Sequence, residues 1–391
     1  MKNPKQIIPY SRQNISEEDI EFVNKVLRSE YLTDGPVVNK FEDTISKKFN
    51  SKYSTVVNSA TSALHISCLA IGLGKNDLVW TVPNTFVATA NCAIYCNAKI
   101  DFVDTEEKTN LISINALKSK LEFAKKNNKL PKIVIPVHLG GQPTLQEKIY
   151  RLSKEYGFKI IEDASHSMGG SRNGELVGSC KWSHATIFSF HPVKIITSGE
   201  GGVVLSNCKD FDRKCKLSRT NGITRDRSLF VNEDEGPWYY EQQSIGHNYK
   251  LSDIHSALGL SQIKKIDKFV NERNKIANIY NAELKNLPIH LPHVLNGNRS
   301  TYHLYVIRLK DQKIKLSHKQ IFKKLIEKGI KVNLHYYPVH LQPFYRNLGF
   351  KENMFPVSEN YAKQAISIPI FPGLKESEQL FVIEGISKLF N

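Results

Sequence analysis

Lys194 is the residue whose setting most strongly suggests covalent chemistry. It follows the apolar segment Phe188-Ser189-Phe190 and precedes the glycine-rich turn Ser198-Gly199-Glu200-Gly201-Gly202. Glycine allows a backbone to approach a bound molecule closely, because it has no side chain to interfere. A lysine shielded from water has a lowered pKa, and its neutral amine attacks aldehydes. The pattern predicts an aldehyde-binding lysine, and a surface lysine laid over apolar neighbours is the alternative.

An acidic residue ends another predicted strand upstream of this lysine. The segment Ile160-Ile161-Glu162 leads into Asp163, and His166 follows three residues later. Ligands of open α/β sheets bind at the carboxyl ends of the strands. A carboxylate there can keep a pyridine nitrogen protonated, so that the ring withdraws electrons. We expect this role for Asp163, with His166 supporting it or contacting a ligand oxygen; the alternative for Asp163 is a helix N-cap.

Two further segments place small polar or aromatic residues directly after predicted strands. Ala60 and Thr61 begin a helical pattern, and the free N–H groups at a helix N-terminus bind phosphate. Phe86 follows Pro83-Asn84 and can stack on a flat ring, where core packing is the alternative. A nucleophilic lysine, a carboxylate, a phosphate cradle and a stacking aromatic together predict a pyridoxal-5′-phosphate (PLP) site.

The elements that position these residues alternate between strands and helices through the first two thirds of the chain. Near-continuous Ile/Val runs between amphipathic helices are typical of a mostly parallel sheet covered on both faces. A first helix is predicted over residues 16–29, where Ser16 and Asp19 can form a capping box. Seven strands are predicted, at residues 53–57, 78–82, 99–103, 132–137, 158–162, 185–190 and 202–206.

The last third of the chain has a different pattern. After an irregular stretch over residues 218–250, a long helix is predicted over 252–285. A small α+β region follows, with strands at 302–309 and 330–334 and helices at 317–328 and 375–389. We therefore expect a large domain with an N-terminal arm, residues 1–255, and a small C-terminal domain, residues 256–391.

Composition narrows the class of protein. The 391 residues are 40% hydrophobic and carry a formal net charge of +16. Lysines are spread along amphipathic helices and no basic run is interleaved with aromatics, which favours a charged surface over a nucleic-acid site. The six cysteines are scattered without a CxxC pair, so we expect a reduced, cytoplasmic protein with no metal site. No stretch approaches the roughly 18 to 20 apolar residues that cross a bilayer.

The sequence resembles the DegT/DnrJ/EryC1/StrS family of sugar aminotransferases over essentially its whole length. The resemblance implies an α/β fold of the aspartate-aminotransferase type (fold type I). A large domain with a mostly parallel seven-stranded sheet would precede a small C-terminal α+β domain. It also implies an enzyme that alternates between the PLP and PMP forms of its cofactor. The resemblance lies in the segments 58–64, 83–91, 162–169, 188–202 and 246–263.

The resemblance assigns roles to individual residues. Lys194 would bind the cofactor as a Schiff base and then move a proton between cofactor and sugar. Asp163 would pair with the pyridinium, and His166 would contact the side of the ring hydroxyl. Phe86 would stack on the ring. The protein would be a homodimer with shared sites, and the phosphate would be held by Ala60, Thr61, Ser189 and, across the interface, Asn248.

Within the family, the sequence resembles the branch that acts in pseudaminic acid synthesis. The stretches 237–241 and 335–338 support this. One departure is Lys250, which stands where the family motif has an arginine and cannot form the bidentate hydrogen bonds of a guanidinium group. The implied reaction moves the amino group of glutamate to C4 of a UDP-linked 4-keto-6-deoxy-N-acetylhexosamine. The resemblance places the nucleotide sugar against Tyr10, Glu30, Tyr31, Leu32, Thr33, His335, Tyr336, Tyr337 and Pro338.

Other functions remain as alternatives. The first keeps the chemistry and changes the substrate to another nucleotide-linked 4- or 3-keto-deoxy sugar. The second is a PLP-fold regulator without catalysis, which the presence of both Lys194 and Asp163 argues against. A related dehydratase subgroup has histidine in place of Lys194, so this lysine also argues against dehydration. The third, a nucleic-acid binder, rests on net charge alone.

Overall fold

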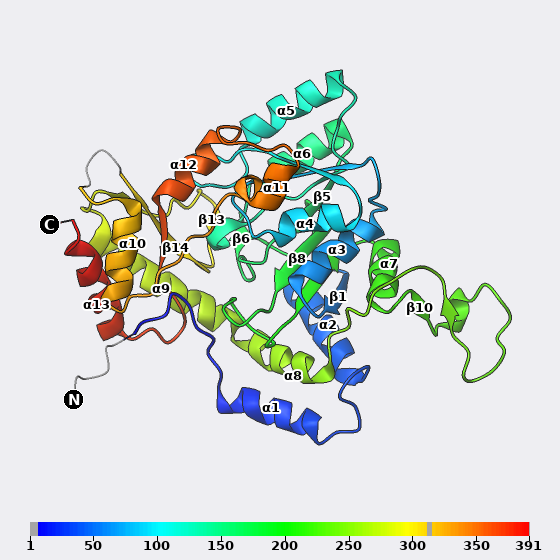
Figure 1. The fold of residues 1–391 in the computed structure, drawn as a ribbon. Helices are drawn as coiled ribbons and strands as arrows, with labels where there is room; N and C mark the ends of the chain where they lie inside the picture. Colours follow the sequence, from blue (N-terminus) through cyan, green and yellow to red (C-terminus); the bar gives the residue numbers. More distant parts are fainter. Residues whose placement is uncertain (1–6, 311–314, 391) are drawn as a thin grey trace.

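The seven predicted strands form one sheet. The computed structural model describes residues 7–310 and 315–390 (Figure 1). The strand order is β1-β9-β8-β5-β4-β2-β3, in which β9 runs antiparallel to β1 and β8 and the other neighbours are parallel. The prediction of a mostly parallel seven-stranded sheet is therefore confirmed. The strands are β1 (Tyr53–Val57), β2 (Leu78–Thr81), β3 (Lys99–Phe102), β4 (Ile133–Val134), β5 (Lys159–Asp163), β8 (Ala185–Ser189) and β9 (Gly202–Ser206).

Helices cover both faces of this sheet, because successive apolar side chains of a buried strand point to opposite faces. Val204 of β9 joins the apolar cluster with α3, α4 and α7, and Val203 joins the cluster with α2 and α8. Helices α5 and α6 cover the rest of this second face. The helices are α2 (Pro36–Phe49), α3 (Ala60–Ala70), α4 (Ala88–Tyr95), α5 (Ile114–Lys126), α6 (Gln146–Tyr156), α7 (Lys209–Arg219) and α8 (Asp253–Gln262).

Charged hydrogen bonds fix the N-terminal helices. Helix α1 (Glu17–Leu27) begins at the predicted capping box, where the Ser16 N–H donates to Asp19 Oδ2 at 2.9 Å. Asp253, the first residue of α8, accepts the N–H groups of Gly35 at 2.8 Å and of Val37 at 2.9 Å at the start of α2. A carboxylate at a helix N-terminus is stabilised by the helix dipole. Helix α8 therefore fixes the turn that precedes α2.

The C-terminal part forms a smaller α+β unit, as predicted. Its three-stranded antiparallel sheet has the order β12-β14-β15, and one apolar cluster joins this sheet to α9, α10 and α13. Its elements are β12 (Ile289–His290), β14 (Tyr305–Leu309), β15 (Ala365–Ile368), α9 (Ile266–Leu284), α10 (His318–Glu327), α12 (Pro356–Gln364) and α13 (Glu376–Ser387). Helix α11 (Pro343–Asn347) instead packs in the core of the large unit through Tyr345.

The strand predicted over residues 330–334 is wrong. This segment makes only isolated bridges, from Ile330 to Ile8 and from Asn333 to Ser367. It crosses from one neighbour to the other instead of following either, so no ladder of hydrogen bonds forms. The crossing brings Asn333 and the residues after it to the edge of the large sheet.

The helix predicted over residues 252–285 is interrupted. A 3₁₀ turn at Ile263–Lys265 separates α8 from α9. Phe269 of α9 packs in the core of the large unit, whereas Ile276 packs in the core of the small one. The division into domains 1–255 and 256–391 stays a prediction, and α9 contributes to both cores.

A projecting segment, residues 225–240, leaves the body of the molecule between β10 and β11 and is called the arm below (Figure 1, right). Its side chains include Val231 and Trp238, which are 84% and 71% exposed. Glu241 is buried at the base, where it accepts N–H groups of Val231 and Asn232 and so fixes the shape of the arm. The remaining short strands are β6 (Ser171–Arg172), β7 (Glu175–Leu176), β10 (Ile223–Thr224), β11 (Glu241–Gln242) and β13 (Asn298–Arg299).

Two findings concern the burial of the cysteines and the length and polarity of the helices. Of the cysteines, Cys208 is exposed, and the other five are buried. Among the described residues, every helix is too short or too polar to cross a bilayer.

Candidate active site

A cavity of about 410 Å³ lies at the carboxyl edge of the large sheet. Cavities that hold small molecules measure about 300 to 1,000 Å³. Its walls come from the ends of β5 and β8, the start of α3, the turn before α4, the N-terminal segment and the segment after Asn333. The predicted site residues that line it are Tyr10, Ala60, Thr61, Phe86, Asp163, His166, Ser189, Lys194, His335 and Tyr336.

Lys194 lies on a closed turn that leaves the end of β8. Its backbone N–H donates to His191 O at 2.9 Å, while the Phe190 N–H donates to Gly201 O at 2.9 Å. Gly199 within this turn has a φ of 81°, which favours glycine. Burial lowers the pKa of the Lys194 amine to about 8, and the charge of Asp163 opposes this shift. The turn thus presents an amine that loses its proton far more readily than an exposed lysine.

Asp163 ends β5 and is held by the hydroxyl group of Thr89 in α4 and by a backbone N–H. Thr89 Oγ1 donates to Asp163 Oδ2 at 2.6 Å, and the Ser165 N–H donates to Oδ1 at 3.1 Å. Thr85 Oγ1 lies 2.7 Å from Thr89 Oγ1. These contacts fix the carboxylate in the cavity wall. The threonines were not predicted as site residues, although their spacing of four before and within a helix could have shown that they share a face.

The start of α3 forms the opposite end of the cavity. Ser59 is the N-cap, and its hydroxyl accepts the Ser62 N–H at 3.1 Å. Ala60 and Thr61 line the cavity, and their N–H groups, in the first turn of α3, have no acceptor within the helix. Ser189 contributes its hydroxyl to the same cavity. This end is suited to an anion, because helix N-termini attract negative charge.

Phe86 lies at the cavity instead of in the core. Its side chain is 58% exposed, which excludes the alternative of core packing. The ring centroids of Phe86 and Tyr336 are 6.2 Å apart. Phe86 is therefore available to pack against a flat ligand.

A wall of neutral histidines and tyrosines faces Phe86. His166 Nδ1 accepts the Gly140 N–H at 3.3 Å, and its Nε2 lies 3.1 Å from Tyr336 Oη. Burial, aided by the charge of Lys194, holds the pKa of His166 well below its ordinary value. The same causes lower the pKa of His335 to about 4. Both imidazoles are therefore uncharged at neutral pH.

Further residues of this wall were not predicted from the sequence. The ring of His303 lies 4.3 Å from that of His166, and Asn333 Nδ2 lies 3.5 Å from His335 Nε2. Glu200 also lines the cavity. No motif marks His303 or Asn333, because both reach the site through the packing of the small unit against the large one.

Several predicted site residues lie outside this cavity. Tyr337 is exposed and Pro338 is buried, and neither lines it. Glu30 to Thr33 form an exposed turn next to α8, where Leu32 O accepts the Asp253 N–H at 3.0 Å. Asn248 is also exposed. Within one chain, these residues therefore do not line the cavity that holds Lys194.

Lys250 forms an ion pair within its own chain. Its Nζ lies 2.5 Å from Asp34 Oδ2. This contact ties the segment of Asn248 and Lys250 to the turn of residues 30–33. The two predicted groups thus form a second cluster on the surface, separate from the cavity.

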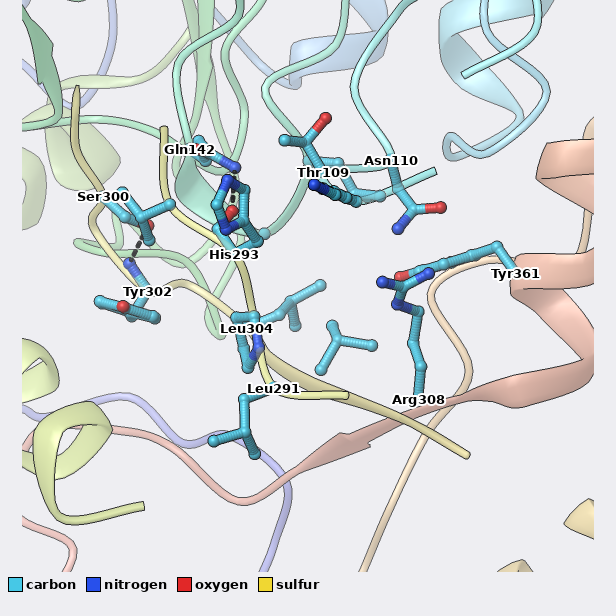
Figure 2. Close-up of a pocket in the computed structure, with 16 residues that line it drawn as sticks. Thr109, Asn110, Gln142, Leu291, His293, Ser300, Tyr302, Leu304, Arg308 and Tyr361 are labelled. Atoms are coloured by element: carbon cyan, nitrogen blue, oxygen red, sulfur yellow. Dashed lines mark hydrogen bonds between the residues drawn. The ribbon is translucent and has the colours of Figure 1, made fainter. Parts of the chain in front are cut away.

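A smaller cavity is lined in part by the turn at Leu139 and Gly140, and Figure 2 shows the side chains around it. Its volume is about 60 Å³, too small for a nucleotide sugar. Gln142 closes one side, since its side-chain amide donates to His293 O at 3.0 Å. Gly140 belongs both to this lining and to the hydrogen bond with His166. The cavity that Lys194 and Asp163 line is therefore the candidate active site.

The fold and the cavity define a PLP-dependent enzyme of the aspartate-aminotransferase type. The family model "DegT/DnrJ/EryC1/StrS aminotransferase family" matches residues 13–387. The chain belongs to this family, whose members are PLP-dependent sugar aminotransferases. The predictions of family, enzyme class and cofactor are thereby confirmed.

Individual relatives are similar over almost the full chain. The UDP-4-amino-4,6-dideoxy-N-acetyl-beta-L-altrosamine transaminase of Campylobacter jejuni is 36% identical and covers 96% of each chain. The spore coat polysaccharide biosynthesis protein SpsC of Bacillus subtilis is 32% identical over 97% of this chain and 96% of its own. The structure of Helicobacter pylori PseC, an aminotransferase involved in the biosynthesis of pseudoaminic acid, has a TM-score of 0.89 and 29% identity, covering 98% of this chain and 99% of that chain.

The residues of the cavity fit PLP chemically. The cofactor has an aldehyde, a pyridine nitrogen, a flat ring and a phosphate. The cavity offers an amine of lowered pKa, a fixed carboxylate, an exposed phenyl ring and a helix N-terminus. Each group of the cofactor therefore has a chemically matched residue.

Proposed function

We propose that this protein transfers the amino group of glutamate to C4 of a UDP-linked 4-keto-6-deoxy-N-acetylhexosamine, as in pseudaminic acid biosynthesis. The observation that carries the proposal is the 36% identity to the Campylobacter jejuni transaminase over 96% of both chains. The structural likeness to Helicobacter pylori PseC supports it. The cavity adds the chemical groups that an amino transfer requires.

In this proposal, PLP supplies an aldehyde that accepts the amino group and a ring that withdraws electrons. Lys194 would hold the aldehyde, and its free amine would take and return the proton at the reacting carbon. Asp163 holds the proton on the ring nitrogen. Ala60, Thr61 and Ser189 hold the phosphate, while Phe86 orients the ring.

The charge of the cavity supports a homodimer with shared sites. Among the described residues that line it, Lys194 is the only lysine or arginine. A UDP-sugar carries about two negative charges on its diphosphate, and burying them without cations is costly. His166 and His335 are neutral and cannot compensate. We infer that a second copy brings Asn248, the turn of residues 30–33 and the arm to the cavity, and that Arg225 and Arg227 of the arm supply the missing positive charge.

The test is an amino-transfer assay with two isomers of the UDP-linked 4-keto N-acetyl sugar. Glutamate is the donor, and the L-arabino and D-xylo isomers compete. We expect a higher kcat/KM for the L-arabino isomer, because this 4-keto sugar leads to the L-altro amino sugar in the name of the Campylobacter jejuni relative. The D-xylo isomer would leave buried hydrogen-bonding groups unpaired, at a cost of roughly 1 to 3 kcal/mol each. A preference for the D-xylo isomer would contradict the proposed substrate and leave the aminotransferase class intact.

A second candidate is another nucleotide-linked keto-deoxy sugar. The 32% identity to Bacillus subtilis SpsC, a spore coat polysaccharide biosynthesis protein, favours it. The same assay with dTDP- and GDP-linked 4-keto sugars separates the two candidates. Turnover of one of these sugars above that of both UDP isomers supports the second.

A further inference from the structure

The direction of the hydrogen bonds around His166 leaves one proton without an acceptor. His166 Nδ1 accepts the Gly140 N–H at 3.3 Å, so in the neutral ring the proton is on Nε2. Nε2–H then donates to Tyr336 Oη, 3.1 Å away. The hydroxyl proton of Tyr336 must consequently point elsewhere.

The cavity is where this proton points. Tyr336 lines the cavity, and among the described residues His166 is the one hydrogen-bond partner of its hydroxyl. Burial, with the nearby charge of Asp163, raises the pKa of Tyr336, so the phenol keeps its proton. Its ring lies 6.2 Å from Phe86, the ring expected to stack on the cofactor. The free donor therefore lies at the end of the cavity that holds Asp163 and Phe86.

We propose that the Tyr336 hydroxyl donates a hydrogen bond to the phenolic oxygen attached to the ring of bound PLP. His166 then acts through Tyr336 as a positioning residue. The sequence resemblance gives this contact to His166 and places Tyr336 at the sugar. The structure instead occupies both nitrogens of His166 with protein groups. The inference concerns the resting cofactor and does not depend on which sugar is bound.

The segment around Tyr336 is built to hold this position. Tyr361 Oη donates to His335 O at 2.9 Å, and His335 Nδ1 lies 2.8 Å from Ser367 Oγ. The His166 and Tyr336 rings are nearly parallel, with an angle of 24° between them. A residue held this firmly can direct one hydrogen bond without losing side-chain entropy on binding.

The test titrates the protein freed of cofactor with PLP, in the absence of any sugar. For Tyr336→Phe, we expect the Kd for PLP to rise about 10- to 100-fold, because a hydrogen bond to a charged oxygen is lost. We also expect the visible absorbance maximum of the bound cofactor to shift. Tyr337→Phe is the matched control, since it removes the hydroxyl of the adjacent tyrosine, which is exposed and does not line the cavity. It should change neither quantity.

Two other outcomes overturn the proposal. If His166→Ala shifts the absorbance while Tyr336→Phe does not, then His166 itself contacts the cofactor. If Tyr336→Phe leaves absorbance and Kd unchanged and raises only the KM for the sugar, then Tyr336 contacts the sugar. Circular dichroism and the Tm of each variant establish that a change in Kd does not reflect unfolding.

Discussion

The ordinary pKa of a lysine, about 10.4, leaves almost no neutral amine at neutral pH. The cavity lowers the pKa of Lys194 to about 8, because burial penalises the charged form more than Asp163 stabilises it. About one amine in ten is then neutral at pH 7. One enclosed position thus converts an unreactive cation into a nucleophile for an aldehyde.

This pKa predicts how cofactor capture depends on pH. The protonated amine is unreactive, so the rate at which the cofactor-free protein binds PLP covalently should rise with pH up to about 8 and level off above it. An exposed lysine would give a rate that keeps rising toward pH 10. Stopped-flow absorbance at a fixed PLP concentration measures the rate.

Lys194→Ala is the control for this experiment. It should abolish covalent capture with little change in Tm, because the removed chain lies on a cavity wall. In the wild-type protein, borohydride reduction should fix PLP covalently to Lys194 alone. A label on another lysine, or a rate that rises through pH 9, would show that a different amine is the nucleophile.

The residues that bear the chemistry were predictable when they stood at strand ends in one short motif. Lys194, Asp163 and Phe86 are of this kind, and all three line the cavity. Thr89 and Asn333 were missed for different reasons. Thr89 acts only through its hydrogen bond to Asp163, 74 residues away, and Asn333 belongs to a segment whose position depends on the packing of the small unit.

At the scale of elements, the close approach of β9 to α3 positions the phosphate end of the cavity. A Cβ atom at Gly202 would lie 2.5 Å from Ala60 N, well inside van der Waals contact with the backbone of a residue that lines the cavity. Backbone cannot yield as a flexible side chain does. The glycine is therefore needed for packing, and its φ is not in the left-handed region.

Gly202→Ala should displace the start of α3. We expect a loss of stability of about 1 to 3 kcal/mol, as for other overpacked sites, together with a higher Kd for PLP. Gly74→Ala is the matched control, because a Cβ there meets nothing within 4 Å. Urea denaturation and PLP titration of both variants measure the two effects. Equal behaviour of the two variants would show that this contact does not position α3.

The large sheet was predictable because most of its strands are short runs rich in Ile and Val that alternate with helices. Residues 330–334 have a similar composition, yet their partners, Ile8 and Ser367, lie far away in sequence and on different segments. Strand β15 is the converse case, because it was not predicted and yet forms a ladder with β14. Local pattern shows that a segment is extended, whereas a ladder also requires a neighbour that runs alongside it.

At the scale of the whole molecule, the predicted residues form two groups that one chain does not unite. Asn248 and the turn of residues 30–33 lie on the surface, tied together by the pair of Lys250 with Asp34. The cavity with Lys194 lies elsewhere. Two chains related by a twofold axis can bring the surface group of each to the cavity of the other.

Mixing two inactive variants tests this arrangement. Lys194→Ala removes the nucleophile, and Asn248→Asp places a negative charge against the phosphate. If Asn248 serves the other chain, each heterodimer has one intact site, and equal mixing should restore up to about a quarter of full activity. No recovery, with exchange of subunits demonstrated, would mean that each site forms within one chain.

The distribution of the cysteines has a practical consequence for such an experiment. Five thiols are buried, and Cys208, just before α7, is exposed and does not line the cavity. A maleimide dye applied to the native protein therefore has one accessible attachment point per chain. Donor and acceptor dyes on separate preparations can then follow the exchange of chains by energy transfer, with the catalytic groups left untouched.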